Sequence, residues 1–149
     1  MQIVKTTSIS LIVMLMGVFG KAQDLKFNTL YFVVNEIAFT NTYDVSNTVG
    51  FTGARSKQIE RFNQLIALAS DQQLLDLAAN HKNAVVRIYS FKALIHKKVI
   101  IPIELLQQFK NDAEKVTQLN GCLGTENTVK SITQLVMLKD FVSPAEIKQ

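Results

Sequence analysis

Apolar residues recur at helical spacing most clearly between Ser70 and Lys98, and this pattern predicts two antiparallel helices joined by a tight polar turn. Ser70 can accept hydrogen bonds from the free amides of a first turn, and Gln73, three residues later, completes a capping box. The apolar stripe of this first helix consists of Leu74, Leu75, Leu77 and Ala78. We expect the rest of the chain to pack against this hairpin.

The second helix of the hairpin, from Ala84 to about Lys97, is apolar on two sides. The turn before it contains His81, Lys82 and Asn83, and Asn83 is a good cap for the helix. One apolar side consists of Val86, Ser90, Ala93 and Leu94, and the other of Val85, Ile88, Phe91 or Lys92, and Ile95. A helix that is apolar on two sides is typical of one that lies between neighbouring elements.

The same helix carries a sequence motif. It consists of Val86-Arg87, Ser90 and Ala93-Leu94. This spacing resembles the V-R-x-x-A-x-x-A-L signature of the second helix of a HEAT repeat, with Ser90 in the place of a small apolar residue. The resemblance implies an all-α fold, a short HEAT-like or armadillo-like right-handed α-α superhelix of about five to seven helices. Because one repeat cannot bury its own faces, the flanking helices would complete the stack.

Four further segments have helical spacing. They cover residues 24–40, 56–69, 102–111 and 125–138. In the first, which predicts an entry helix, the β-rich run 30–34 leaves a strand as the alternative. Ser56 and Pro102 suit the first turns of the next two helices, because serine is a good cap and proline lacks an amide that would be unpaired there. Thr125 or Asn127 caps the last of the four.

Two stretches lack helical spacing. The first, from Asn41 to Ala54, contains Asn, Thr, Ser, Asp and two glycines, and is predicted to be an irregular loop. Loops of this length in a compact domain are often functional or mobile. The second, from Asp112 to Gly124, is predicted to form a turn of helix followed by an extended link, because Asn120-Gly121 and Gly124 interrupt its apolar residues.

The N-terminal 22 residues have the three parts of a secretory signal peptide. Lys5 lies in a short polar region, residues 9–19 are apolar, and Gly20-Lys21-Ala22 precedes the expected cleavage before Gln23. The apolar run is shorter than the roughly 20 residues that span a bilayer, and an uncleaved anchor is the alternative. We therefore expect a periplasmic or secreted protein with Gln23 as its mature N-terminus and no stable membrane insertion after signal cleavage.

Composition narrows the classes of partner. Of the 16 basic residues, Lys5 and Lys21 belong to the signal, so the mature chain carries 14 basic and 12 acidic residues, a balance of +2. These charges are scattered without arginine-rich runs, which argues against a nucleic-acid partner. Residues 23–149 have the size of a single domain with one core. Cys122 is the only cysteine, so no intrachain disulfide can form.

The chain offers few groups for catalysis, and we predict no cofactor, no bound metal and no enzymatic activity. The two histidines, His81 and His96, belong to no pair with metal-ligand spacing, and His96 suits a helix C-terminus, where the dipole favours positive charge. Cys122 could form a thiol dyad with either histidine. Its place between Gly121 and Leu123 in an apolar link, however, predicts an inert core thiol.

Arg87 lies in the motif helix, and we expect it to be buried or half-buried. A buried arginine needs an acid on a neighbouring element, and Asp112 and Asp76 are the candidates. The alternative is an arginine that binds a carboxylate or phosphate of a ligand.

Two functions follow as hypotheses. The first is a non-enzymatic protein-protein interaction module of the bacterial envelope or secreted space, a monomer or weak oligomer with an unidentified protein partner. The second is a small-ligand-binding protein or minor hydrolase whose site lies under the loop 41–54, with Tyr43, Asp44, Arg87 and His81 as polar contacts. A well-formed pocket next to that loop would favour the second hypothesis.

Overall fold

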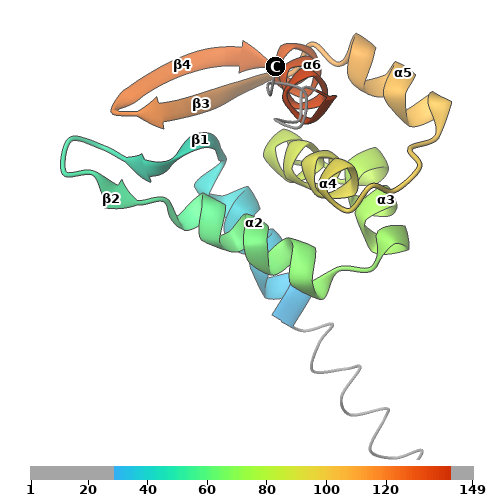
Figure 1. The fold of residues 1–149 in the computed structure, drawn as a ribbon, viewed down its shortest axis with the longest axis horizontal. Coiled ribbons are helices and arrows are strands. Elements are labelled where there is room, and N and C mark those ends of the chain that lie inside the picture. Colours follow the sequence, from blue (N-terminus) through green and yellow to red (C-terminus); the bar gives the residue numbers. More distant parts are fainter. Residues whose placement is uncertain (1–28, 142–149) are drawn as a thin grey trace, which may run out of the picture.

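The computed structural model describes the backbone of residues 29–141 and the side chains of residues 29–139. Within this part of the chain the protein has an α/β fold, with six helices and a four-stranded mixed sheet (Figure 1). The prediction of an all-α superhelix is therefore wrong. The predicted signal peptide, with its cleavage before Gln23, lies outside the described residues.

A helix, two strands, four helices, two strands and a final helix follow one another along the described chain. The first helical segment comprises residues 29–40. The other elements are β1 (Thr42–Val49), β2 (Ala54–Arg55), α2 (Lys57–Leu68), α3 (Asp71–Asn80), α4 (Ala84–His96), α5 (Ile103–Asn111), β3 (Lys115–Gly121), β4 (Leu123–Thr128) and α6 (Val129–Phe141). None of the helices in the described part of the chain is long and apolar enough to cross a membrane.

The sheet consists of two hairpins that lie side by side, in the strand order β2-β1-β3-β4 (Figure 1). β1 and β3 are parallel, with Tyr43 opposite Gln118, and each outer strand is antiparallel to its neighbour. A parallel pair needs a long crossover, which here contains α2 to α5. The hairpins also meet near their tips, where the amide of Gly50 donates to the carbonyl of Gly121 at 3.1 Å.

The strands lie mainly in the two stretches for which the sequence predicts no helix, and β4 continues to Thr128, within the segment predicted as the last helix. They are polar, and their fully buried residues are confined to the beginning of each central strand: Tyr43 and Asp44 in β1, and Val116 in β3. Because most side chains of the sheet are exposed or half-buried, the alternation of apolar and polar residues that marks a half-buried strand is weak. The pairing of β1 with β3 joins distant parts of the sequence, so no local pattern reveals it.

α4 lies at the centre of the core. Every residue from Ala84 to Phe91 is buried, and the helix packs against α2, α3, α6 and the two central strands. The prediction that this helix lies between neighbouring elements is confirmed. The centroid of the Tyr89 ring lies 5.1 Å from that of Tyr43 and 5.6 Å from that of Phe62. Full burial of one large apolar side chain contributes about 1.5–3 kcal/mol to stability.

Three helix starts agree with the predicted caps. The Ser70 hydroxyl accepts from the amide of Gln73 at 3.2 Å, and the Gln73 side chain accepts from the amide of Ser70 at 2.9 Å, which completes the capping box of α3. Ser56 and Asn83 each accept from the amide three residues later, at the starts of α2 and α4. The predicted helical hairpin is therefore confirmed, and its resemblance to a HEAT repeat stays a prediction.

The last described helix begins later than the sequence predicts. α6 starts at Val129, because the residues before it extend along β3 as strand β4. The amide of Ser131 donates to the hydroxyl of Thr128 at 3.2 Å, and the amide of Thr128 donates back to the hydroxyl of Ser131 at 3.2 Å. Thr128 therefore has the capping role that the sequence assigns to Thr125 or Asn127.

A first testable prediction concerns Ser90 of α4, which is fully buried. Its hydroxyl has no hydrogen-bond partner among the described residues. A buried, unsatisfied hydroxyl costs about 1–3 kcal/mol. We therefore expect Ser90→Ala to raise the free energy of unfolding by about 1 kcal/mol in a urea titration followed by circular dichroism.

Ser46→Ala is the matched control. The Ser46 hydroxyl donates to the carbonyl of Thr48 at 2.7 Å and accepts from the amide of Gly121 at 2.8 Å, so its removal should lower stability. A loss of stability in Ser90→Ala as well would show that the Ser90 hydroxyl has a partner in the folded protein.

Candidate functional site

The four residues predicted as polar contacts, Tyr43, Asp44, His81 and Arg87, are not brought together into one site. Tyr43 and Asp44 are neighbours at the start of β1, and their side chains point to opposite faces of the sheet. Arg87 lies near the start of α4, and His81 directly follows α3. The structure therefore places each of the four in a different environment.

Arg87 forms an ion-pair cluster and is 10% exposed. One terminal nitrogen of its guanidinium lies 2.8 Å from Asp112 and 2.7 Å from Glu114. The other donates to the carbonyls of His81 at 3.1 Å and Lys82 at 3.3 Å. Burial by itself lowers the pKa of Arg87, but the two carboxylates together raise it above its usual value. The guanidinium therefore stays charged and connects the α3–α4 turn with the link between α5 and β3.

This cluster favours the structural interpretation of Arg87. The predicted pairing with Asp112 is confirmed. The other candidate acid, Asp76, instead accepts a hydrogen bond from the side chain of Asn80 at 2.8 Å. Glu114, the second acid of the cluster, was not predicted, because nothing in its local sequence marks it as a partner. With two carboxylates and two carbonyls bound, the guanidinium has an anchoring role.

Asp44 is the centre of a second buried polar cluster, which joins β1, α2 and α4. Its carboxylate accepts hydrogen bonds from the hydroxyls of Ser56 at 2.6 Å and Thr42 at 3.0 Å. Its amide donates to the hydroxyl of Tyr89 at 2.9 Å. Burial raises the pKa of Tyr89, which is therefore neutral. The Asp44 side chain thus anchors the capping residue of α2 to the sheet.

Two polar side chains of α2 bind the preceding elements. Gln58 is buried, and its amide group donates to the carbonyl of Thr42 at 2.7 Å. Arg61 lies 2.8 Å from Glu36. Together these bonds hold the end of the helical segment 29–40 against α2. A glutamine near a helix start carries no local signal of burial, so sequence reasoning missed Gln58.

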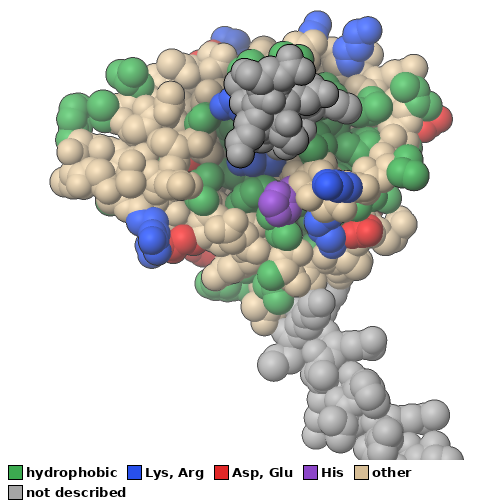
Figure 2. Space-filling view, viewed as in Figure 1, with side chains coloured by type: hydrophobic (Ala, Val, Ile, Leu, Met, Phe, Trp, Pro, Cys, Tyr) green, Lys and Arg blue, Asp and Glu red, His purple; other side chains and the backbone are tan. Residues whose placement is uncertain are grey.

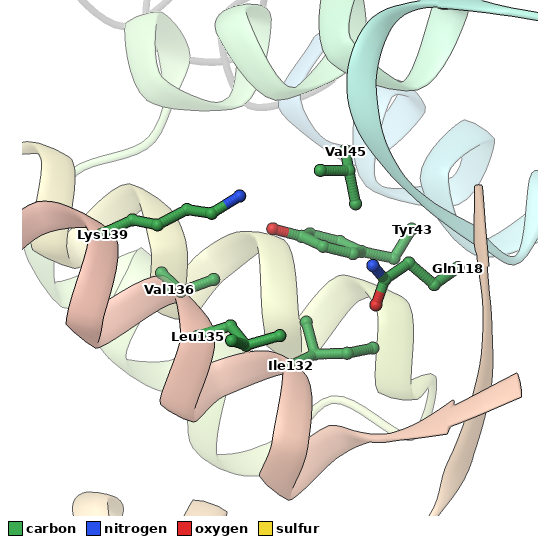
Figure 3. A pocket seen from close by; sticks show the side chains of 7 residues that line it. All are labelled: Tyr43, Val45, Gln118, Ile132, Leu135, Val136 and Lys139. Carbon is green, nitrogen blue, oxygen red and sulfur yellow. The ribbon is translucent and has the colours of Figure 1, made fainter. Parts of the chain in front are cut away.

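Tyr43 lines a small hollow between the sheet and α6 (Figure 3). Its other lining residues include Val45, Gln118, Ile132 and Lys139. The volume of about 40 Å³ leaves room for a few water molecules. A site for a small organic ligand is several times larger, so this hollow does not favour a ligand site next to β1.

A larger pocket, of about 230 Å³, lies between the helical segment 29–40 and α3. Its apolar lining includes Leu30, Tyr31 and Leu77, and its polar lining includes Asn35, Asp76 and His81. Among the described lining residues, Asp76 is the only charged one. The sequence places His81 in a turn but does not show that the entry helix closes a pocket over it.

His81 is neutral at pH 7. Burial lowers the pKa of its imidazole below the usual value, and the positive charges of Lys82 and Arg87 lower it further. The amide of Asn83 donates to Nδ1 at 3.1 Å, which requires an unprotonated Nδ1. The neutral ring therefore carries its proton on Nε2 and adds no charge to the pocket.

Cys122 is not a core residue. It is exposed in the turn between β3 and β4, so the prediction that its thiol lies in the core is wrong. The predicted apolar link is in fact a hairpin whose tip extends away from the helices (Figure 1). His81 and His96 lie elsewhere, at the ends of α3 and α4. Within the residues that the structure describes, no cluster of three His, Cys, Asp or Glu side chains could hold a metal ion.

The helical segment 29–40 exposes aromatic side chains on the side that points away from the core. Phe32 is 64% exposed and Phe39 is 88% exposed. They are seven residues apart and therefore lie on the same side of the helix. Tyr31, which is 63% exposed, lies beside this side and also lines the pocket. We call Tyr31, Phe32 and Phe39 the aromatic face. Their spacing is visible in the sequence, but only the structure shows which side of the helix is buried.

The charged side chains on one side of the molecule do not form a single patch of one sign (Figure 2). On the side shown in Figure 2, basic side chains lie apart from one another or close to acidic ones. Exposed ion pairs join Lys57 to Glu60 at 3.1 Å and Lys97 to Asp71 at 2.7 Å. This side of the molecule therefore presents no continuous basic surface.

The class of protein is defined here by fold alone: a mixed four-stranded sheet that packs against a helical core built around α4. Comparison of the chain with models of protein families, with curated proteins and with solved structures gives no match. The function is therefore inferred from the geometry of the surface and its pockets.

A second prediction tests the role of Arg87. We expect Arg87→Met to lower the free energy of unfolding by about 3 kcal/mol, because Asp112 and Glu114 lose their shared cation while the aliphatic packing is largely kept. Urea titration measures this loss.

Arg55→Met is the control for Arg87→Met. Arg55 is exposed in β2, so its replacement should change stability by no more than about 0.5 kcal/mol. An Arg87→Met protein as stable as the wild type would contradict the anchoring role.

A third prediction concerns the pH dependence of stability. Because the pKa of His81 is lowered in the folded protein, the unfolded chain binds a proton more readily below pH 6.5. The stabilising contribution of the neutral imidazole is therefore present above pH 6.5 and is lost as the pH falls toward the folded-state pKa. In urea titrations, the free energy of unfolding of the wild type relative to that of His81→Gln should decrease as the pH is lowered from about 7.5 to about 5. A difference that rises toward acid pH would contradict this assignment.

Proposed function

We propose that the protein is a non-enzymatic protein-protein interaction module of the bacterial envelope or secreted space, and that its protein partner binds the aromatic face. The observation that carries this proposal is the exposure of Tyr31, Phe32 and Phe39 on one ordered helix. Exposed apolar patches mark interaction sites in soluble proteins, and aromatic residues are enriched in the centres of protein interfaces.

The C-terminal half of the helix that carries the aromatic face is bonded to neighbouring elements. At its C-terminal end, Arg61 binds Glu36 at 2.8 Å and Thr40 at 2.6 Å. On the other side, the Asn83 side chain donates to the carbonyl of Ala38 at 3.4 Å. Since little ordering remains to be done on binding, such a pre-organised surface gains affinity.

Polar groups lie within and beside the aromatic face. The ion pair between Glu36 and Arg61 lies along one edge, and the exposed Asn35 lies between Tyr31 and Phe39 on the same side of the helix. Protein interfaces combine aromatic residues with polar groups that form hydrogen bonds. The arrangement supports a protein partner over a nucleic acid, whose phosphates would need a basic surface.

The cellular location in this proposal derives from the sequence. A signal over residues 1–22 and a mature N-terminus at Gln23 would deliver the domain to the periplasm or the medium. The partner is then an exported or envelope protein.

A fourth prediction tests the binding surface. We expect the double variant Phe32→Ser, Phe39→Ser to lose at least about tenfold in affinity for the partner, because two aromatic anchors leave the interface. The mature chain serves as bait in an envelope extract of the native host, and bound proteins are identified by mass spectrometry. The affinity of each recovered protein is then measured with purified components.

Phe51→Ser is the control for the double variant. Phe51 is 96% exposed at the tip between β1 and β2 and is not part of the aromatic face. Phe51→Ser should bind the partner like the wild type. All variants should keep the wild-type circular dichroism spectrum. Unchanged binding by the double variant would overturn the proposal. A turnover activity that disappears in Cys122→Ala or His81→Ala would also overturn it.

A further inference from the structure

The pocket between the helical segment 29–40 and α3 adjoins the aromatic face, because Tyr31 belongs to both. A partner that covers the aromatic face therefore also covers the pocket. With a volume of about 230 Å³, the pocket is smaller than the roughly 300–1,000 Å³ of typical sites for small molecules. Its size suits one long side chain that anchors a partner protein.

The lining of the pocket combines an apolar wall with one negative charge. Leu30, Val34 and Leu77 provide aliphatic surface. Asp76 provides the charge, and it forms no ion pair with any described residue. One of its carboxylate oxygens accepts a hydrogen bond from Asn80 at 2.8 Å, which leaves the second oxygen as an acceptor. The complementary group has an aliphatic stem and a positive end.

The other polar lining residues fit the same group. The side chain of Asn35 offers an amide oxygen as a further acceptor, and His81 is neutral and does not repel a cation. The guanidinium of Arg87, close to His81, is neutralised by Asp112 and Glu114. Asp76 therefore carries the one charge among the described residues that line the pocket.

We propose that this pocket receives an arginine side chain of the protein partner, an inference that rests on the proposed function. The aliphatic part of the arginine lies against Leu30 and Leu77, and its guanidinium donates to Asp76 and Asn35. Arginine fits better than lysine, because its planar guanidinium donates to two acceptors at once and stacks on an aromatic ring such as that of Tyr31.

A fifth prediction tests this pocket without the partner. N-acetyl-L-arginine amide is titrated into the mature ¹⁵N-labelled protein, and amide shifts are followed by NMR. We expect saturable shifts in residues 30–35 and 73–81, with a dissociation constant in the millimolar range that such a small ligand allows. N-acetyl-L-lysine amide should bind more weakly, and N-acetyl-L-norleucine amide, which lacks the charge, should bind most weakly.

Asp76→Asn and Asp71→Asn form a matched pair of variants on α3. Asp76→Asn should weaken binding of the arginine probe about tenfold and leave binding of the norleucine probe unchanged, because only the charge-assisted hydrogen bond is removed. Asp71 pairs with Lys97 and does not line the pocket, so Asp71→Asn should bind the arginine probe like the wild type. In capture of the partner, Asp76→Asn should likewise bind more weakly than the wild type, and Asp71→Asn should bind like the wild type.

The outcomes separate this inference from the proposed function. Three results would overturn the arginine assignment. The arginine probe gives no saturable shift, it binds Asp76→Asn as tightly as the wild type, or the norleucine probe binds the wild type as tightly as the arginine probe does. If partner binding still depends on Phe32 and Phe39 in that case, the proposed function stands. If the probe binds as expected but the partner binds Asp76→Asn as tightly as the wild type, the pocket is not the partner's anchor and the inference is wrong.

Discussion

The structure depends on the burial of α4 on all of its sides. Because this helix carries Arg87 into the interior, Asp112 and Glu114 must neutralise the charge. The carbonyls of the same two acids accept hydrogen bonds from the first amides of α6: the amide of Val129 donates to Glu114 at 2.9 Å, and that of Lys130 donates to Asp112 at 3.0 Å. The two ion pairs of Arg87 and these backbone hydrogen bonds thus position the end of α5, the start of β3 and the start of α6 around the central helix.

A second constraint is the need to satisfy the backbone hydrogen-bonding groups at the start of β1, because strand β2 does not reach that far along β1. β2 pairs only with Thr48 and Val49, so earlier backbone groups of β1 need other partners. Side chains of the helical layer provide them: the Gln58 side chain donates to the carbonyl of Thr42, and the Tyr89 hydroxyl accepts from the amide of Asp44. Gln58 and Tyr89 therefore complete a sheet edge. This explains why Asp44, a plausible ligand contact from sequence, has a structural role.

The proposed interaction surface is a consequence of the same packing. The helical segment 29–40 buries one side against the core and is bonded along its flanks to α2 and to the α3–α4 turn. Its remaining side cannot reach the core, so Phe32 and Phe39 are exposed. The hairpin tips also expose apolar residues, Phe51 and Leu123, but these belong to the part of the sheet that extends beyond the helices. The aromatic face differs from the tips because it lies on a helix that is bonded to α2 and to the α3–α4 turn.

Local patterns in the sequence determined the helices. Capping and periodicity act over short distances, so the sequence predicted the capping box at Ser70, the cap at Asn83 and the burial of the second hairpin helix. It also predicted the pairing of Arg87 with Asp112, because the need to neutralise a buried charge follows from residue type. Only the tertiary structure decided the rest. The polar strands form a sheet because β1 pairs with β3, although four helices lie between them in the sequence. This pairing makes the fold α/β and places Cys122 in an exposed hairpin turn. It also holds Tyr43 and Asp44 in the sheet, away from His81 and Arg87. The pocket beside the aromatic face likewise exists only where the entry helix lies against α3.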